Sequence, residues 1–270
     1  MITREPEFFA PALNARGRLG RVILVSCRNA GRSLLILWEA LLDLRFAFSR
    51  RSRPFVLQQL YITGIKSLGV ITVVGMFTGM ILALQTGLEL RKFGQEVNIG
   101  AAVMITMLRE MGPFMTAMIL AASVGASFAA ELGTMVVSEE IAALEVMSIS
   151  PVRFLVMPRL AAMMVMTPLL TFYACMIGVM GGAIVGSTQL GVAFNAYMDN
   201  AVRWAENKDL YIGLLKAFVF GIMITIISCH QGFSTTEGAV GVGRATRRSV
   251  IISFLSLLIV GYIITRLFYE

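Results

Sequence analysis

One uninterrupted apolar run constrains this chain more than any other feature. Residues Ser67 to Gly87 read SLGVITVVGMFTGMILALQTG, which is 21 residues without a charged side chain. A helix of about 20 apolar residues is sufficient to cross the roughly 30 Å hydrocarbon core of a bilayer. We therefore expect this segment to span a membrane.

Four further apolar segments follow, and together they predict spans at about 67–87, 99–130, 160–186, 211–229 and 250–268. The composition agrees, since 57% of the 270 residues are hydrophobic and only 14% are charged. A soluble domain is about a quarter charged, so a water-soluble globule is excluded. The expected fold is an all-α integral membrane protein with five transmembrane helices.

The first 54 residues have a different character. Between residues 20 and 48, arginines alternate with apolar clusters such as LLILWEALLDLRFAF, and Glu39 interrupts the apolar stretch. This segment is too short and too charged to span, so we expect an amphipathic helix in the cytoplasmic interface with Trp38 at headgroup depth. A soluble helical hairpin is the alternative. The chain then divides into residues 1–54, cytoplasmic or interfacial, and a five-span domain at 55–270.

The basic residues predict the orientation. With a cytoplasmic N-terminus, the inner segments carry 16 Lys and Arg and the outer segments carry 5, while Arg109 and Lys216 fall within spans. Cytoplasmic loops are enriched in Lys and Arg, so the N-terminus is expected inside and the C-terminus outside. The net charge of +7 then fits an anionic membrane surface better than nucleic acid.

Charged residues within spans are the main candidates for a functional site. Arg109 and Glu110 lie in LREMGP, inside or at the edge of the second span, and Lys216 lies near the start of the fourth. Such charges are costly in a membrane and usually face a cavity or a partner. They could share a site for an anionic lipid headgroup, with Arg109 and Lys216 on the phosphate. Alternatively, Lys216 snorkels to the surface and Arg109 pairs structurally with Glu110 or another helix.

The polar stretch at 131–159 contains a short helical pattern. Ser138 is a possible N-cap, Glu139 and Glu140 occupy the first turn, and Ser150-Pro151 ends the pattern. Its apolar residues at helical spacing are Ile141, Leu144 and Met147. This helix is either a surface element without a function of its own or a coupling element that docks in a groove of a partner.

The sequence lacks the motifs typical of nucleotide binding, metal binding and lipid hydrolysis. GAVGVGRAT at 238–246 has Arg and Ala where a P-loop needs Lys and Ser or Thr, so a nucleotide site is not expected. His230 is the only histidine, and the three cysteines have no paired spacing, so we expect no metal, no disulfide and no cofactor. Neither H-E-x-x-H nor G-x-S-x-G occurs, which argues against an intramembrane lipid enzyme.

Four ordered motifs resemble the MlaE family of permeases, which belong to ABC systems that traffic phospholipids or related lipids. They are LREMGP at 108–113, AAELGTM at 129–135, EEIAALEVMSISPVRFLVMPR at 139–159 and EGAVGVGRATRRSVI at 237–251. The chain departs from the family pattern at Ser123, where many relatives have Arg, and at Gly261, where they have an acidic residue.

The resemblance implies a non-catalytic, multi-pass permease subunit in the inner membrane of a diderm bacterium, working as a homodimer. Its implied partners are a separate ATP-binding cassette ATPase, a periplasmic MCE-domain oligomer, membrane phospholipids and, in some systems, a STAS-domain protein. By motif, the residues near the lipid cavity are Arg109, Glu110 and Lys216. The ATPase-coupling residues are Glu139, Glu140, Ile141, Leu144, Glu145 and Met147. A self-sufficient, ion-coupled carrier that uses the three intramembrane charges as a relay is the alternative.

Overall fold

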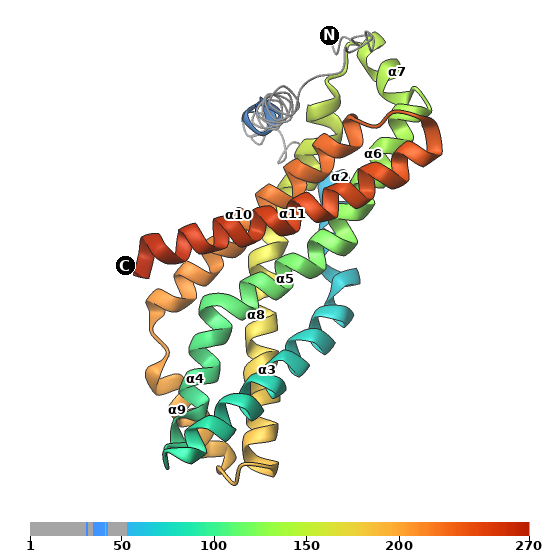
Figure 1. Ribbon diagram of the computed structural model, residues 1–270. Coiled ribbons are helices and arrows are strands. Elements are labelled where there is room, and N and C mark those ends of the chain that lie inside the picture. Colours follow the sequence, from blue (N-terminus) through green and yellow to red (C-terminus); the bar gives the residue numbers. More distant parts are fainter. Residues whose placement is uncertain (1–30, 32–34, 41, 43–52, 270) are drawn as a thin grey trace, which may run out of the picture.

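The computed structural model describes residues 31, 35–40, 42 and 53–269, and the regular elements within 53–269 are all helical. Five continuous helices run over Arg53–Lys92, Glu96–Val137, Val152–Thr188, Asn207–Phe233 and Gly238–Tyr269. Each is long and apolar enough to cross a membrane, and together they form one elongated bundle (Figure 1). The predicted all-α membrane fold with five spans is confirmed.

Short π-helical turns interrupt the first two long helices, and another begins the third. The first comprises α2 (Arg53–Leu60), a π turn (Tyr61–Ile65) and α3 (Lys66–Lys92). The second comprises a 3-10 turn (Glu96–Asn98), α4 (Ile99–Thr106), a π turn (Met107–Met111), α5 (Gly112–Leu120), another π turn (Ala121–Gly125) and α6 (Ala126–Val137). The third comprises a π turn (Val152–Val156) and α8 (Met157–Thr188).

The fourth and fifth long helices are α10 (Asn207–Phe233) and α11 (Gly238–Tyr269). Two short helices connect the long ones: α7 (Glu140–Val146) precedes the third, and α9 (Phe194–Trp204) precedes the fourth. They lie at opposite ends of the bundle (Figure 1). Each predicted span falls inside one of the long helices, which extend beyond it because a helix can continue into water once its polar residues are solvated.

Small residues allow α3 and α8 to pack closely. A Cβ atom added to Gly79 would overlap the backbone carbonyl of Gly178, and one added to Gly75 would lie 3.2 Å from the carbonyl oxygen of Ala174. Gly75 and Gly79 form a G-x-x-x-G pair, a sequence pattern that predicts the close approach of another helix, and this prediction is confirmed. Gly178, Gly182 and Gly186 form a second row with the same spacing in α8, and Gly186 faces the ring of Tyr197 from α9.

The predicted helix cap in the 131–159 stretch is wrong. Ser138 ends α6, because its amide donates to the carbonyl of Thr134 at 2.9 Å, so it cannot begin the next helix. The chain turns at Glu139, whose φ of 60° is left-handed, and α7 then begins at Glu140 and ends at Val146, before the predicted Ser150-Pro151 boundary. Sequence alone did not separate a residue that ends one helix from one that starts another.

The expected interfacial helix lies largely outside the described residues. Within them, residues 35–40 are helical, and Trp38 is 66% exposed. Ala40 packs in a core cluster with residues of α6, α7, α8 and α10, and Glu39 accepts a hydrogen bond from Ser150 at 2.9 Å.

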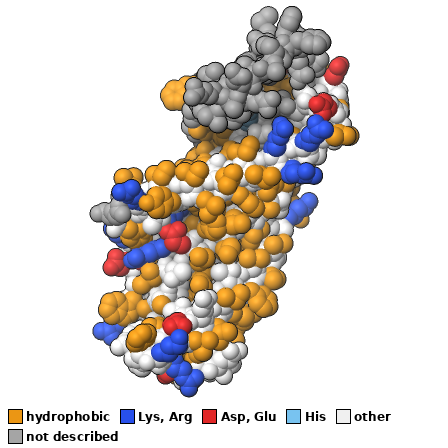
Figure 2. Space-filling view, viewed as in Figure 1, with side chains coloured by type: hydrophobic (Ala, Val, Ile, Leu, Met, Phe, Trp, Pro, Cys, Tyr) orange, Lys and Arg blue, Asp and Glu red, His pale blue; other side chains and the backbone are white. Residues whose placement is uncertain are grey.

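The surface is largely apolar. Figure 2 shows hydrophobic side chains over most of the visible face, with Lys and Arg gathered mainly near its margins. Such a distribution suits lipid contact along the middle of the bundle and water or headgroups at its ends.

Outside the long helices, burial raises the pKa of Tyr197 in α9, so this phenol stays neutral.

Candidate functional site

The π turn at Met107–Met111 presents Arg109 and Glu110 toward neighbouring helices. Pro113 follows it and has no amide hydrogen to donate to the carbonyl of Arg109, the acceptor four residues earlier. That carbonyl instead accepts a hydrogen bond from Lys216 Nζ of α10 at 2.8 Å. The LREMGP motif thus leaves an acceptor inside the bundle without its i+4 donor, and another helix satisfies it.

Lys216 is the most deeply buried cation of the site. Its side chain is 1% exposed, and its ammonium group also donates to Glu110 Oε1 and to Thr265 Oγ1, each at 2.7 Å. An ammonium group has three hydrogens, so these three acceptors use all of them. Lys216 is therefore held inside the protein and does not snorkel to the surface.

Glu110 is the more open partner of this ion pair. Its Oε1 accepts from both Lys216 and the Thr265 hydroxyl of α11, the latter at 2.6 Å, and its side chain is 44% exposed. Because Thr265 touches both members of the pair, the C-terminal part of α11 is fastened to α10 and to the π turn.

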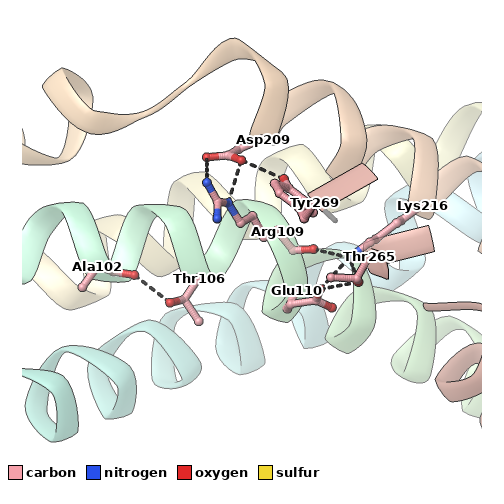
Figure 3. A network of polar contacts seen from close by, with 8 residues as sticks. All are labelled: Ala102, Thr106, Arg109, Glu110, Asp209, Lys216, Thr265 and Tyr269. Carbon is pink, nitrogen blue, oxygen red and sulfur yellow. Dashed lines mark hydrogen bonds and ion pairs between the residues drawn. The ribbon is translucent and has the colours of Figure 1, made fainter. Parts of the chain in front are cut away.

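Arg109 forms a second ion pair with Asp209 near the start of α10. Its Nε lies 2.6 Å from Oδ1 and its Nη2 lies 3.1 Å from Oδ2, which is a bidentate contact to a carboxylate with no exposed surface. Tyr269 at the end of α11 donates its hydroxyl to Asp209 Oδ1 at 2.7 Å, and the guanidinium lies 4.5 Å from the centre of the Tyr269 ring. Figure 3 shows the two ion pairs side by side, each contacted by α11.

The structure thus brings the three predicted charges together, and of the two partners that the sequence left open for Arg109 it has the one on another helix. Arg109 pairs with Asp209 of another helix, and Glu110 pairs with Lys216. Sequence reasoning missed Asp209, which it placed in a polar connection, as well as Thr265 and Tyr269. The latter two are four residues apart, so they share one face of α11, and this spacing was the available signal.

A cavity of about 350 Å³ adjoins the Glu110–Lys216 pair. Its walls come from the second long helix, α10 and α11, and its lining residues are Glu110, Met111, Phe114, Lys216, Phe220, Leu257, Leu258, Gly261, Tyr262 and Thr265. Small-molecule sites of this size typically combine apolar walls with a few polar groups. Here the polar end is the ion pair, and the remainder is mostly aromatic and aliphatic.

The predicted coupling residues divide into two groups in α7 and its flanks. Ile141 is buried and Leu144 half-buried, and both pack against the protein's own core. The exposed members are Glu139, Glu140, Glu145 and Met147, and Val146 beside them is 86% exposed. The face available to another protein is therefore acidic with a small apolar edge.

A third ion pair joins the helices on either side of α7. Arg159 Nη2 of α8 lies 2.8 Å from Glu131 Oε2 of α6, and the arginine side chain is 6% exposed. The same guanidinium donates to the carbonyl of Leu155 and lies 5.4 Å from the ring centre of Phe128. These contacts hold the two helices together next to the connecting helix.

A bundle of five membrane-length helices that holds two ion pairs beside an apolar cavity defines an integral membrane protein of the permease type. Residues 56–267 match the family model described as Permease MlaE. The chain belongs to the MlaE permease family.

Relatives of known name support this assignment. A probable ABC transporter permease protein of Rickettsia prowazekii is 40% identical over 215 residues, which cover 80% of this chain and 83% of the relative. The intermembrane phospholipid transport system permease protein MlaE of Haemophilus influenzae is 32% identical over 260 residues, covering 95% and 98%. The chloroplastic protein TRIGALACTOSYLDIACYLGLYCEROL 1 of Arabidopsis thaliana is 36% identical over 214 residues, covering 79% and 61%. The chain is thus a permease subunit of an ABC transporter, a class that works with an ATPase.

Proposed function

We propose that this permease moves phospholipid between the inner membrane of a diderm bacterium and a periplasmic MCE-domain carrier, while a separate subunit hydrolyses ATP. The observation that carries the proposal is the cavity between α5, α10 and α11, which has charged groups at one end and apolar walls elsewhere. This division matches an amphiphile with a polar headgroup and hydrocarbon chains. The name of the Haemophilus influenzae relative supports phospholipid as the class of substrate.

The three charges predicted from the sequence take different parts in this proposal. Arg109 has one terminal nitrogen, Nη1, without a hydrogen bond to the described residues, and this group can bind a phosphate oxygen. Glu110 lines the cavity directly. Lys216 has no donor left, so it acts by holding Glu110 and the π turn in place.

The proposed orientation places the α7 end of the bundle in the cytoplasm. Arg153 lies near α7, and Arg244, Arg247 and Arg248 lie in the first part of α11, so these basic residues follow the positive-inside rule. Five crossings then put the C-terminus in the periplasm. Residues 1–54 form the proposed interfacial segment, and the assembly contains two copies of the chain, the ATPase, the MCE oligomer and, in some systems, a STAS-domain protein.

The proposed route of coupling is α7. Its exposed acidic face and the apolar edge at Val146 and Met147 offer a surface for the ATPase, while Ile141 and Leu144 anchor the helix to the bundle. A displacement of α7 would be transmitted to α6 and α8, which flank α7 in the chain and are joined to each other by the Glu131–Arg159 ion pair. The cavity would then change shape, because α6 belongs to the same long helix as the lining residues Glu110, Met111 and Phe114.

The transport proposal can be tested by filling the cavity. Gly261→Leu places a side chain among the cavity-lining residues, where even a Cβ atom would lie 3.3 Å from Phe220 Cζ. Gly243→Leu is the matched control, since it lies in the same helix with no atom within 4 Å of an added Cβ. In proteoliposomes with the ATPase and the carrier, we expect Gly261→Leu to lower ATP-dependent phospholipid transfer at least about tenfold, and the control to remain close to the unmodified protein.

Equal transfer by Gly261→Leu and Gly243→Leu would show that lipid does not use this cavity. Transfer by the isolated chain without any nucleotide would instead establish the ion-coupled carrier.

The coupling proposal has a separate test. Combined replacement of Glu140, Glu145 and Met147 by Ala removes exposed groups only, so we expect the bundle to keep its thermal stability while ATPase binding weakens. Glu89→Ala at the other end of the bundle is the control, because it removes an exposed carboxylate whose ion pair with Lys92 is worth little. Unchanged copurification of the ATPase with the triple variant would remove α7 from the docking surface.

A further inference from the structure

Of the two charged residues that line the cavity, only Glu110 keeps an atom without a hydrogen bond to the described residues. Its Oε1 atom accepts from Lys216 and Thr265, whereas its Oε2 atom has no hydrogen bond to any described residue. Lys216 also lines the cavity, but all three of its ammonium hydrogens are already engaged. The charged group of the lining that can still accept a hydrogen bond is therefore the Glu110 carboxylate.

The charges of the surrounding cluster balance. Arg109 and Lys216 supply two positive charges, and Asp209 and Glu110 supply two negative charges. Burial is uneven, since the side chain of Lys216 is 1% exposed and that of Glu110 is 44% exposed. A purely anionic headgroup would thus meet no excess of positive charge and would approach the carboxylate first.

The other described residues that line the cavity carry no charge that could neutralise this carboxylate. Phe114, Phe220 and Leu257 are apolar, Tyr262 adds a neutral hydroxyl, and among the described residues Lys216 is the one lysine or arginine in the lining. Next to such surfaces an ionic hydrogen bond is stronger than in water. A ligand that brings its own cation to Glu110 is favoured over one that does not.

We propose that the cavity selects phospholipids whose headgroup carries a primary ammonium group, which donates a hydrogen bond to Glu110 Oε2. This inference rests on the proposed function and specifies its substrate class. The ammonium complements the carboxylate, and the phosphate of the same headgroup is left for other donors. A trimethylated headgroup has the same charge but no N–H to donate, so it binds less well than the primary ammonium.

Competition among three lipids tests the selection. The full complex, with its ATPase, is placed in vesicles that contain equal amounts of phosphatidylethanolamine, phosphatidylcholine and phosphatidylglycerol, and bound lipids are quantified by mass spectrometry. We expect ethanolamine lipid to be enriched roughly tenfold over glycerol lipid, with choline lipid between them, as one charge-assisted hydrogen bond allows. Equal occupancy, or enrichment of glycerol lipid, would overturn the inference while leaving phospholipid transport intact.

A charge-neutral variant provides the second arm. Glu110→Gln keeps an oxygen that can accept from Lys216 and Thr265 but loses the negative charge, so the ethanolamine enrichment should fall to near onefold. Glu89→Gln removes an exposed carboxylate near the C-terminal end of α3, a helix that does not line the cavity, and should keep the enrichment. Persistence of the enrichment in Glu110→Gln would also overturn the inference. The absence of any bound or transferred phospholipid in the unmodified complex would overturn the proposed function itself.

Discussion

Replacing Lys216 by Met tests whether this lysine holds the site together. Met has a similar length and fills the same space, but it removes the ammonium that bonds to Arg109 O, Glu110 Oε1 and Thr265 Oγ1. The Arg109 carbonyl thereby loses its interhelical donor. No i+4 amide can replace that donor, because residue 113 is a proline without an amide hydrogen. An unsatisfied buried acceptor costs about 1–3 kcal/mol.

The lost ion pair adds less than a fully buried pair would. Breaking a buried pair costs about 3–5 kcal/mol because a charge is left uncompensated. Glu110 is 44% exposed, so solvent or headgroups can stabilise its carboxylate, and a value of about 1 kcal/mol is more appropriate. We therefore expect Lys216→Met to lower the free energy of unfolding by about 2–4 kcal/mol in total.

Thr265→Val is the control for this experiment. It removes the hydroxyl that contacts both Lys216 and Glu110 but keeps both charges, so it should cost only about 1 kcal/mol. Both variants would be compared by detergent-induced unfolding of the purified chain, followed by the loss of helical circular dichroism. If Lys216→Met is no more destabilising than Thr265→Val, the buried, triply bonded lysine described above is refuted.

Two further changes test other contacts. Gly79→Ala would force a methyl group into the carbonyl of Gly178, so despite a better helix propensity we expect a net loss of about 1–3 kcal/mol in unfolding free energy and a lower yield of folded protein. Gly69→Ala is the control, because open space surrounds an added Cβ atom there, and it should be neutral or stabilising. Equal stability of the two variants would contradict the α3–α8 packing. Tyr269→Phe removes the hydroxyl bonded to Asp209 while keeping the ring, so it should cost about 1 kcal/mol in the same unfolding assay, and an unchanged stability would argue against that hydrogen bond.

Elements that depend on local composition could be predicted from the sequence. The five apolar runs gave the number and order of the long helices, because a span needs only sufficient length and few charges. Gly75 and Gly79 indicated a close helix contact for the same local reason. The boundary at Ser138 was wrong, since capping depends on the hydrogen bond that the residue makes and not on its type alone.

The candidate site could be predicted only in part. Arg109, Glu110 and Lys216 stand out because charges are rare in apolar runs. Their partners do not, because Asp209 lies among polar residues at the start of α10, and Thr265 and Tyr269 are unremarkable in a membrane helix. Nothing in the linear order says which carboxylate pairs with which cation.

The sequence by itself determined that the chain forms membrane helices, how many there are, and that charge occurs inside them, because hydrocarbon imposes length and polarity on each segment separately. Only the tertiary structure decided that Lys216 is saturated and that Glu110 keeps an open oxygen toward a cavity. These properties depend on distances between residues about 50 to 160 positions apart, and such distances arise only when α5, α10 and α11 pack together.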